Sequence, residues 1–348
     1  MKLERFAVDV PEAVLDDLRR RLDTTRWPDD GPGGLALGDA RRLASRWSAG
    51  YDWRAAEATL NGFSQWMSSD GVHCIAEGDG PPVLLLHGWP SSVWEFHRII
   101  PVLRESMRVV VPSLPGYGFS APRRAGIVEM ADALHALMGA LGHRRYLVAG
   151  GDWGASIACR LAYAYPGAVE ALHLNMLPIR RPSTWPESEA SSRRALEAWL
   201  QEEGGYGHIQ GTRPQTLTYG LHDSPVGLLS WIAEKFDVWT DARGVPDDDV
   251  LTTATIYWAT GTIGTSFWPY YTRIHGEWVL DDVIEAGERL RPPLTFLDFP
   301  REIVHVPRTV AERVFDIERW EEPDYGGHFP ALEATDVLAD SLRRFTSR

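Results

Sequence analysis

The sequence contains little of what marks a disulfide-rich, metal-binding, nucleic-acid-binding or membrane-spanning protein. Its two cysteines, Cys74 and Cys159, form no paired motif, so neither a disulfide framework nor a zinc site is predicted. The formal net charge of −13 argues against nucleic acid and anionic membranes as partners. No apolar run approaches the ~20 residues of a membrane span, and the first residues lack the apolar stretch of a signal peptide. We therefore expect a cytoplasmic protein.

What the chain has instead is the composition and the strand pattern of a large α/β protein. Apolar residues make up 44% and charged residues 24% of its 348 positions, the usual proportions of a globular protein. Apolar runs at 83–86, 109–111 and 146–149 show no polar alternation, which is typical of parallel strands buried on both faces. Helical patterns at 130–141 and 155–165 follow. The alternation predicts a mostly parallel sheet flanked by helices.

We divide the chain into an N-terminal wrapping segment, a first part of the core, a mainly helical cap and a second part of the core, with the boundaries 1–80, 81–179, 180–285 and 286–348. The cap is assigned from its Trp- and Tyr-rich helical spacing, which replaces the strand pattern of the core. The other expected elements are a strand at 6–11, helices at 11–22, 39–49 and 53–62, strands at 169–176 and 294–297, and a closing helix at 333–345.

The most informative motif is Gly-Gly-Asp-Trp-Gly at residues 150–154, between a predicted strand and a predicted helix. Its glycines permit a sharp turn that holds one side chain above the sheet edge, as in the nucleophile elbow of an α/β-hydrolase. Here that side chain is Asp152. A carboxylate is ionised near neutral pH and is suited to displacing a leaving group at a saturated carbon, as in an epoxide or an alkyl halide. N-capping of the following helix is the alternative role for Asp152.

A carboxylate nucleophile leaves an alkyl-aspartyl ester, and its hydrolysis requires a base, an acid that orients the base, and donors for the oxyanion. In this fold the chain order is nucleophile, acid, histidine. His328 lies in a glycine-rich loop before the last predicted helix, where the base is expected. Asp298 and Glu302 both follow the strand at 294–297. Spacing alone does not choose between these two acids.

Two further sets of groups complete the expected chemistry. The backbone N–H groups of Trp89, in His-Gly-Trp-Pro at 87–90, and of Trp153 are the expected oxyanion donors. The oxygen that leaves an opened epoxide also needs an acid, and a tyrosine with a pKa near 10 is well matched to it. The cap offers five tyrosines between which chemistry alone does not choose: Tyr206, Tyr219, Tyr257, Tyr270 and Tyr271.

Motifs spread over nearly the whole chain resemble those of the microsomal-type epoxide hydrolases, a branch of the α/β-hydrolases with a characteristic N-terminal region. The matching motifs are DVP at 9–11, TRWP at 25–28, YDWR at 51–54, HGWP at 87–90, PSLPGYGFS at 112–120, GGDWG at 150–154, LNM at 174–176, QGTRPQT at 210–216, DSPVG at 223–227, TGTI at 260–263, FPRE at 299–302 and GGHF at 326–329. So many motifs in the family's order make a chance match improbable. The resemblance is to a soluble, bacterial-type member.

The resemblance implies roles for single residues. It assigns Asp152 as the nucleophile and His328 as the base. It selects Glu302 over Asp298, because the family's acid lies in a Phe-Pro-x-Glu pattern like the one at 299–302.

It also implies which tyrosines bind the epoxide oxygen. They are Tyr206 and Tyr270. Because Trp-Pro at 268–269 departs from the usual pattern, Tyr271 stays an alternative to Tyr270.

The leading hypothesis is thus a cofactor-free and metal-free epoxide hydrolase that makes a vicinal diol. Its partners would be a small hydrophobic epoxide and water, with a homodimer as one option for assembly. The Trp- and Tyr-rich cap predicts an apolar, aromatic or bulky substrate, which fits detoxification and secondary metabolism equally well.

Three alternatives remain at this point. A haloalkane-type dehalogenase would use the same Asp152, with Trp153 and a cap tryptophan as halide donors; the cap candidates are Trp231, Trp239 and Trp258. An epoxide enzyme could use a hydroxyl of its own substrate as the second nucleophile and make a cyclic ether. A non-catalytic scaffold would only bind a hydrophobic ligand.

Overall fold

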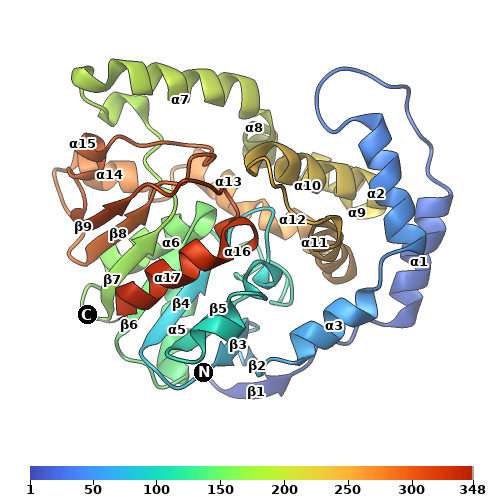
Figure 1. Ribbon diagram of the computed structural model, residues 1–348, viewed down its shortest axis with the longest axis horizontal. Coiled ribbons are helices and arrows are strands. Elements are labelled where there is room, and N and C mark those ends of the chain that lie inside the picture. Colours follow the sequence, from blue (N-terminus) through green and yellow to red (C-terminus); the bar gives the residue numbers. More distant parts are fainter. Residues whose placement is uncertain (347–348) are drawn as a thin grey trace.

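The computed structural model describes residues 1–346, apart from the side chain of Pro182. Among these residues, nine strands form one sheet in the order β1-β2-β3-β5-β4-β6-β7-β8-β9. Their bounds are β1 Leu3–Phe6, β2 Gln65–Ser68, β3 His73–Glu77, β4 Pro82–Leu86, β5 Arg108–Pro112, β6 Tyr146–Gly150, β7 Val169–Leu174, β8 Pro293–Leu297 and β9 Asp316–Glu321. The six strands from β4 to β9 pair in parallel, and β1 to β3 are antiparallel to their neighbours. The predicted mostly parallel α/β-hydrolase sheet is confirmed (Figure 1).

The parallel strands have apolar residues on both faces because both faces are covered. Successive side chains of a strand point to opposite faces. In β4, Leu84 and Leu86 belong to one buried cluster, together with helices α5 (Ile127–Ala140) and α6 (Asp152–Ala164). Val83 and Leu85 belong to a second cluster on the other face. That second cluster also contains residues of α4 (Ile100–Leu103) and α17 (Thr335–Thr346). Continuous burial explains why the core strands lack polar alternation.

The N-terminal helices lie beside the core and reach the cap. They are α1 Glu12–Asp23, α2 Leu37–Ala49 and α3 Trp53–Asn61. Trp47 of α2 donates its indole N–H to Thr255 Oγ1 at 2.8 Å in a buried contact with the cap. The Tyr51 hydroxyl lies 2.8 Å from Thr252 Oγ1, and Arg46 forms a two-point contact with Asp248 at 2.7 and 2.8 Å. The N-terminal segment therefore connects the sheet, through β1, with the cap (Figure 1).

The strand predicted at 6–11 is wrong. The strand there covers Leu3–Phe6, and residues 7–10 belong to no strand. The reason is that helix α3 satisfies this backbone: the N–H of Val8 donates to Asn61 Oδ1 and that of Val10 to Glu57 Oε1, both at 2.8 Å. A strand pattern in the sequence thus corresponds to an extended segment whose partners are side chains.

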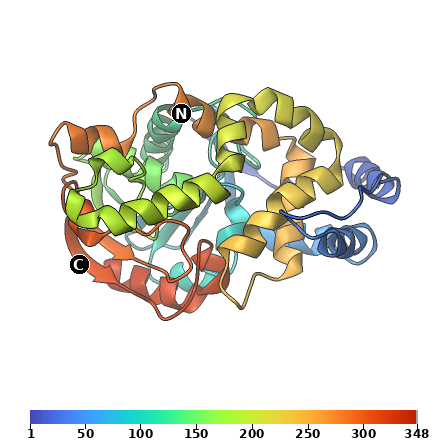
Figure 2. The same cartoon turned by 90° about the horizontal axis from the view of Figure 1, so that it is seen from above.

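The cap lies between β7 and β8 and consists of helices in the part of the chain that the structure describes. Their bounds are α7 Ala190–Glu203, α8 Gly205–Thr212, α9 Pro214–Asp223, α10 Pro225–Trp239, α11 Asp247–Thr260, α12 Ile263–Ser266, α13 Trp268–Ile274 and α14 Leu280–Glu285. The short helices α15 Arg308–Ala311 and α16 Pro330–Glu333 follow in the second part of the core. Seen from above, α7 crosses over the core, and α10 and α11 lie next to the N-terminal helices (Figure 2).

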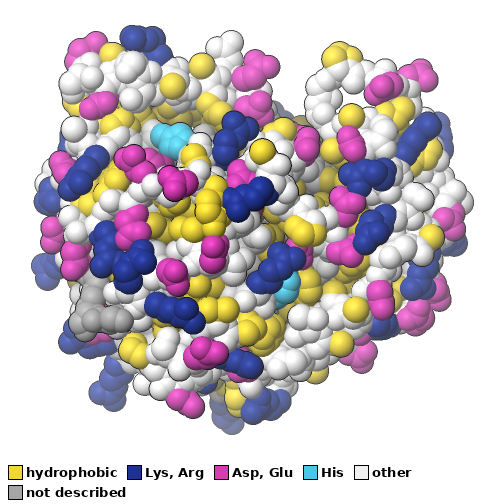
Figure 3. All heavy atoms as spheres, in the orientation of Figure 1, with side chains coloured by type: hydrophobic (Ala, Val, Ile, Leu, Met, Phe, Trp, Pro, Cys, Tyr) yellow, Lys and Arg dark blue, Asp and Glu magenta, His cyan; other side chains and the backbone are white. Residues whose placement is uncertain are grey.

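The visible surface carries charges of both signs. On the face in Figure 3, acidic and basic side chains are interspersed and apolar side chains lie between them. No helix within residues 1–346 is long and apolar enough to cross a bilayer.

Candidate active site

Asp152 stands at the turn between β6 and α6, at the carboxyl edge of the parallel strands. Its φ of 46° lies in the left-handed region, which costs an L-residue about 1–2 kcal/mol. The neighbouring glycines make this turn feasible. A Cβ atom at Gly154 would overlap the carbonyl oxygen of Leu86, so only glycine lets α6 approach β4 this closely. The turn therefore has the geometry of a nucleophile elbow, with the carboxylate presented at the sheet edge.

The Asp152 carboxylate is held by the loop that follows β4. The backbone N–H of Trp89 donates to Asp152 Oδ1 at 2.8 Å. Gly88, just before it, lies so close that a Cβ atom there would overlap this carboxylate. The second expected donor, the N–H of Trp153, makes no hydrogen bond to the carboxylate within the described residues, although it follows Asp152 directly. The structure thus places both expected N–H groups next to Asp152 and shows one of them in contact.

His328 lies between Asp152 and Glu302. Its Nδ1 is 2.7 Å from Glu302 Oε1, and its Nε2 is 3.8 Å from Asp152 Oδ2. Both His328 and Glu302 are buried, and the N–H of Ile303 also donates to Glu302 Oε1 at 2.7 Å. The acid therefore fixes one ring nitrogen of the histidine and leaves the other facing Asp152.

The other acid candidate lies in a different environment. Asp298 Oδ1 is 2.8 Å from Nδ1 of His305, a half-exposed histidine that has no contact with the elbow. The structure therefore brings Glu302, and not Asp298, to His328, as the family pattern implies.

The two carboxylates change the protonation of His328. Burial alone would lower the pKa of His328, but the charge and hydrogen bond of Glu302 and the charge of Asp152 raise it to about 9. The imidazole is consequently protonated at neutral pH.

Of the five cap tyrosines, Tyr206 of α8 and Tyr270 of α13 face each other over Asp152. Their ring centres are 5.9 Å apart, and both side chains are buried. Tyr206 stacks on Trp89 at 5.3 Å, and Tyr270 meets the edge of Trp153 at 4.7 Å. Each tyrosine ring thus packs against one of the two tryptophans that flank the nucleophile.

The other three tyrosines have different surroundings. Tyr257 donates its hydroxyl to the carbonyl of Ser91 at 3.1 Å, and Tyr219 is 70% exposed. Tyr271 stacks on Trp268 and His275, at 4.7 and 3.9 Å. These contacts favour Tyr270 over Tyr271 as the partner of Tyr206.

Both facing tyrosines are neutral and able to donate a proton. Burial and the Asp152 charge raise the pKa of Tyr206 to about 12, against the opposite effect of Arg180 and Arg273. Burial also raises the pKa of Tyr270. Within the described residues, the Tyr270 hydroxyl has no partner with hydrogen-bond geometry. Such a hydroxyl is free to bind an oxygen of a ligand.

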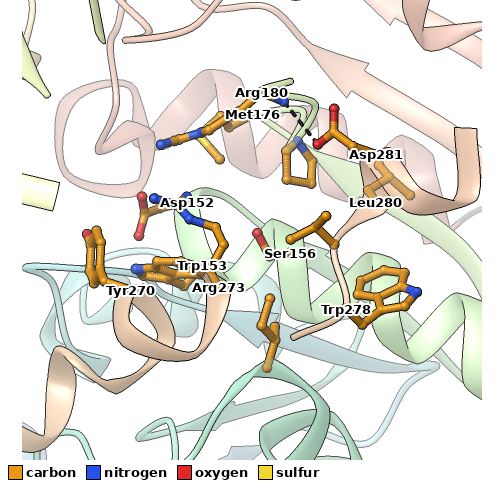
Figure 4. Close-up of a pocket in the computed structure, with 13 residues that line it drawn as sticks. Asp152, Trp153, Ser156, Met176, Arg180, Tyr270, Arg273, Trp278, Leu280 and Asp281 are labelled. Carbon is orange, nitrogen blue, oxygen red and sulfur yellow. Dashed lines mark hydrogen bonds between the residues drawn. The ribbon is translucent and has the colours of Figure 1, made fainter. Parts of the chain in front are cut away.

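A cavity of about 40 Å³ lies in front of Asp152. Its apolar wall is formed by Ile127, Met176, Pro178, Trp278, Val279 and Leu280. Arg180 and Arg273 also line it, and their guanidinium groups point toward the side of the nucleophile (Figure 4). Neither arginine was identified from the sequence. The spacing of three residues does place Arg273 on the same helix face as Tyr270.

A second, smaller feature lies behind the nucleophile. A cavity of about 10 Å³, close to the size of one water molecule, is lined by Asp152, His328, Ser91 and Glu95. Glu95 is buried, and burial raises its pKa to about 7. A water at this place would touch both the base and the carboxyl group of the nucleophile.

The fold and the elbow define this protein as an α/β-hydrolase. Comparison with family models agrees: residues 81–206 match the model described as alpha/beta hydrolase fold, and residues 3–96 match the one described as epoxide hydrolase N terminus.

Full-length relatives define the family more narrowly. A protein of Stigmatella aurantiaca is 37% identical over 97% of this chain and 83% of its own. Epoxide hydrolase 1 of Sus scrofa is 31% identical over 98% of this chain and 87% of its own. The structure of the Aspergillus niger epoxide hydrolase superposes with a TM-score of 0.89, at 28% identity, over 100% of this chain and 96% of that one. The chain belongs to the microsomal-type epoxide hydrolase family.

Proposed function

We propose that this protein hydrolyses epoxides to vicinal diols through a covalent ester on Asp152. The observation that carries the proposal is the arrangement around this carboxylate. His328 approaches it from one side at 3.8 Å, and Tyr206 and Tyr270 face it from the cap. Family membership supports the same reaction, because relatives along the whole chain are named epoxide hydrolases.

In the first step, Asp152 attacks a ring carbon of the epoxide. The C–O bond of the ring breaks, and a new C–O bond joins the carbon to the carboxylate. The ring oxygen takes a proton from Tyr206 or Tyr270, which are both neutral donors at the start. The apolar cavity wall keeps bulk water away from the ring during this step.

In the second step, His328 removes a proton from a water molecule, and the water attacks the carbonyl carbon of the ester. The N–H groups of Trp89 and Trp153 bind the oxyanion. When the tetrahedral intermediate collapses, the bond between the carbonyl carbon and the diol oxygen breaks, this oxygen takes the proton held by His328, and the acid proton of the restored Asp152 returns to His328. Esterification prepares the base for this role. Once Asp152 has lost its charge, one of the carboxylates that raise the pKa of His328 is gone. The imidazole can then release its proton to the tyrosinate left by the first step and become a base.

The alternatives receive less support from the contacts. Trp231 donates its indole N–H to Gln210 at 2.9 Å, and Trp258 packs under Arg21, so neither is available to a halide at Asp152. Trp239 packs against His328, and its indole N–H, like that of Trp153, has no hydrogen-bond partner within the described residues, so the dehalogenase alternative depends on this pair and is tested below. A scaffold without activity does not explain a buried base oriented by a buried acid. A cyclic ether product differs from a diol by mass and is identified by product analysis.

The test uses the His328→Gln variant and intact-mass spectrometry with styrene oxide and the corresponding alkyl chloride. The variant should open the ring and keep the ester, because general-base catalysis contributes about 10²–10⁴-fold to hydrolysis. We expect a mass gain equal to the whole epoxide, mapped to the peptide with Asp152. His305→Gln is the matched control, since that half-exposed histidine contacts Asp298 and should turn over like the wild type.

Other outcomes of this test would overturn the proposal. A mass gain equal to the alkyl group without its chlorine would indicate a dehalogenase. Turnover by the wild type without an adduct on the variant would show that water attacks the ring directly.

A further inference from the structure

Two cationic side chains face the cavity of the nucleophile. Arg180 follows β7 at the entry to the cap, and Arg273 lies on α13, one helical turn after Tyr270. Both line the cavity of about 40 Å³ that Asp152 also lines. Figure 4 shows their guanidinium groups and the Asp152 carboxylate gathered at one end of this cavity.

Neither arginine forms an ion pair within the described part of the chain. The contact of the Arg180 guanidinium is with Met176 Sδ at 3.3 Å. Asp281, the nearest acid on that side, accepts instead from the backbone N–H groups of Arg180 and Arg181, at 3.3 and 2.9 Å. The Arg273 guanidinium lies 4.9 Å from the ring centre of Trp153.

Two acids, Asp152 and Asp281, line the same cavity as the two arginines, but neither carboxylate forms an ion pair with them within the described residues. Burial and the charge of Arg180 lower the pKa of Arg273, whereas Asp152 and the tyrosines raise that of Arg180 above its usual range. Bringing two partly buried cations together costs free energy unless an anion joins them. Both guanidinium groups therefore lack a carboxylate partner that an acidic group of a ligand would supply.

A second cavity extends the site beyond the arginines. It has a volume of about 230 Å³ and is lined by Arg180, Arg273, Tyr206, Trp199, Leu200 and Ile274, among others. The same two guanidinium groups thus border both cavities. A ligand group held by them would lie between the reacting ring and an apolar outer wall.

We propose that Arg180 and Arg273 bind an acidic group of the substrate, a carboxylate or a phosphate, so that this enzyme acts on epoxides that carry a negative charge close to the ring. The inference rests on the proposed function of the same site. Guanidinium groups match carboxylate and phosphate oxygens with two-point hydrogen bonds. A site for an acidic group also replaces the expectation, from the sequence, of a purely apolar pocket.

Charge gives a physical reason for such a pair. An acidic epoxide is repelled by the nucleophile carboxylate and by the net charge of −13. Two cations beside Asp152 offset this repulsion at the place where the substrate meets the carboxylate. An uncharged epoxide would not need them.

A role of the two arginines in strengthening Tyr206 as an acid predicts different kinetics. The charges of Arg180 and Arg273 also lower the pKa of Tyr206, which strengthens it as an acid. If that were their whole role, they would accelerate the opening of charged and uncharged epoxides alike. Specificity for an acidic group changes the ratio between the two kinds of substrate.

The experiment compares kcat/KM for matched pairs of epoxides. One pair is 3-phenylglycidate and 3-phenylglycidamide, which differ in charge at the same place; the other is glycidyl phosphate and glycidol. We expect the wild type to favour the charged member of at least one pair by about 10-fold or more, and the pair that shows this identifies the acidic group. Styrene oxide reports activity on an epoxide without an acidic group.

Variants connect this preference with the arginines. In Arg180→Met and Arg273→Met, the ratio of kcat/KM for charged over uncharged substrate should fall by about 10- to 100-fold, the effect of losing a charge-assisted hydrogen bond. Arg273→Lys should retain part of the ratio because it retains the charge. Arg181→Met is the control, since Arg181 forms ion pairs with Asp282 and Glu285 outside the cavity, and its ratio should equal that of the wild type.

Two results would overturn the inference. A wild type that turns over styrene oxide and prefers the uncharged member of both pairs has no site for an acidic group. Equal losses on both members of a pair in the arginine variants would show that the arginines act through the tyrosines. A different result would contradict the proposed function itself, and the inference with it: no turnover of any of these epoxides by the wild type, and no adduct on the His328→Gln variant.

Discussion

The pKa of His328 should depend on the charge of Asp152, and the Asp152→Asn variant tests this directly. The amide has nearly the shape of the carboxylate. Like the esterified side chain in the proposed intermediate, it carries no charge. Asp152 Oδ2 lies 3.8 Å from His328 Nε2 in the structure. At this distance, two unit charges interact by roughly 1 kcal/mol in water and roughly 4 kcal/mol at an effective dielectric constant of 20. Loss of the charge should therefore lower the pKa of His328 by roughly 1 to 3 pH units.

The expected result is a value near or below 8 in the variant, starting from about 9 in the wild type. A histidine with such a pKa exchanges its proton near neutral pH, as a general base must. The assay is a pH titration by NMR of histidine-labelled protein, with His328→Gln to assign the signal. Mass spectrometry shows whether the introduced amide has stayed intact. An unchanged pKa of His328 in Asp152→Asn would refute the idea that ester formation prepares the base.

Three further predictions concern the same residues. Gly88→Ala should abolish turnover without unfolding the protein, measured by steady-state kinetics and circular dichroism, because the added Cβ would overlap the Asp152 carboxylate. Tyr206→Phe and Tyr270→Phe should each slow ester formation by about 10²–10³-fold in single-turnover experiments, since each removes one donor to the developing oxyanion; a variant as fast as wild type would exclude that tyrosine. The raised pKa of His328, about 9 against an ordinary 6.5, stabilises the fold fully below pH 6.5, and this contribution is lost as the pH rises through 9. Urea unfolding should show this alkaline loss in wild type and a flatter profile in His328→Gln.

The core and the elbow were readable in the sequence because their signals are local. The apolar runs at 83–86 and 146–149 became β4 and β6, and the glycines around Asp152 mark a turn that few other residues allow. The order nucleophile, acid, histidine then restricted where the remaining groups could lie. The sequence left Asp298 and Glu302 open as acids, because both follow the same strand and the choice depends on how the loop folds back.

Features that depend on distant contacts could not be read in this way. The strands β2, β3 and β9 are short and partly polar. Although β2 and β3 form a hairpin, β2 joins the sheet through β1 and β3 through β5, and both of these strands are far away in the sequence. Arg180 and Arg273 are separated by most of the cap, and an arginine on a helix usually lies on the solvated face. Their meeting at one cavity is set by the packing of the cap on the core, which has no local signature.

The contact of the N-terminal segment with the cap has a mechanical consequence. The cap is joined covalently to the core at two places, before α7 and after α14, and Trp47, Tyr51 and Arg46 attach it at a third. This attachment works as a non-covalent cross-link in a chain whose two cysteines are buried and unpaired. We expect it to restrain α11, which carries all three contact residues, from swinging away from the sheet as a lid. We expect substrate and product to pass on the other side, at α7 and α8, which line the cavity of about 230 Å³.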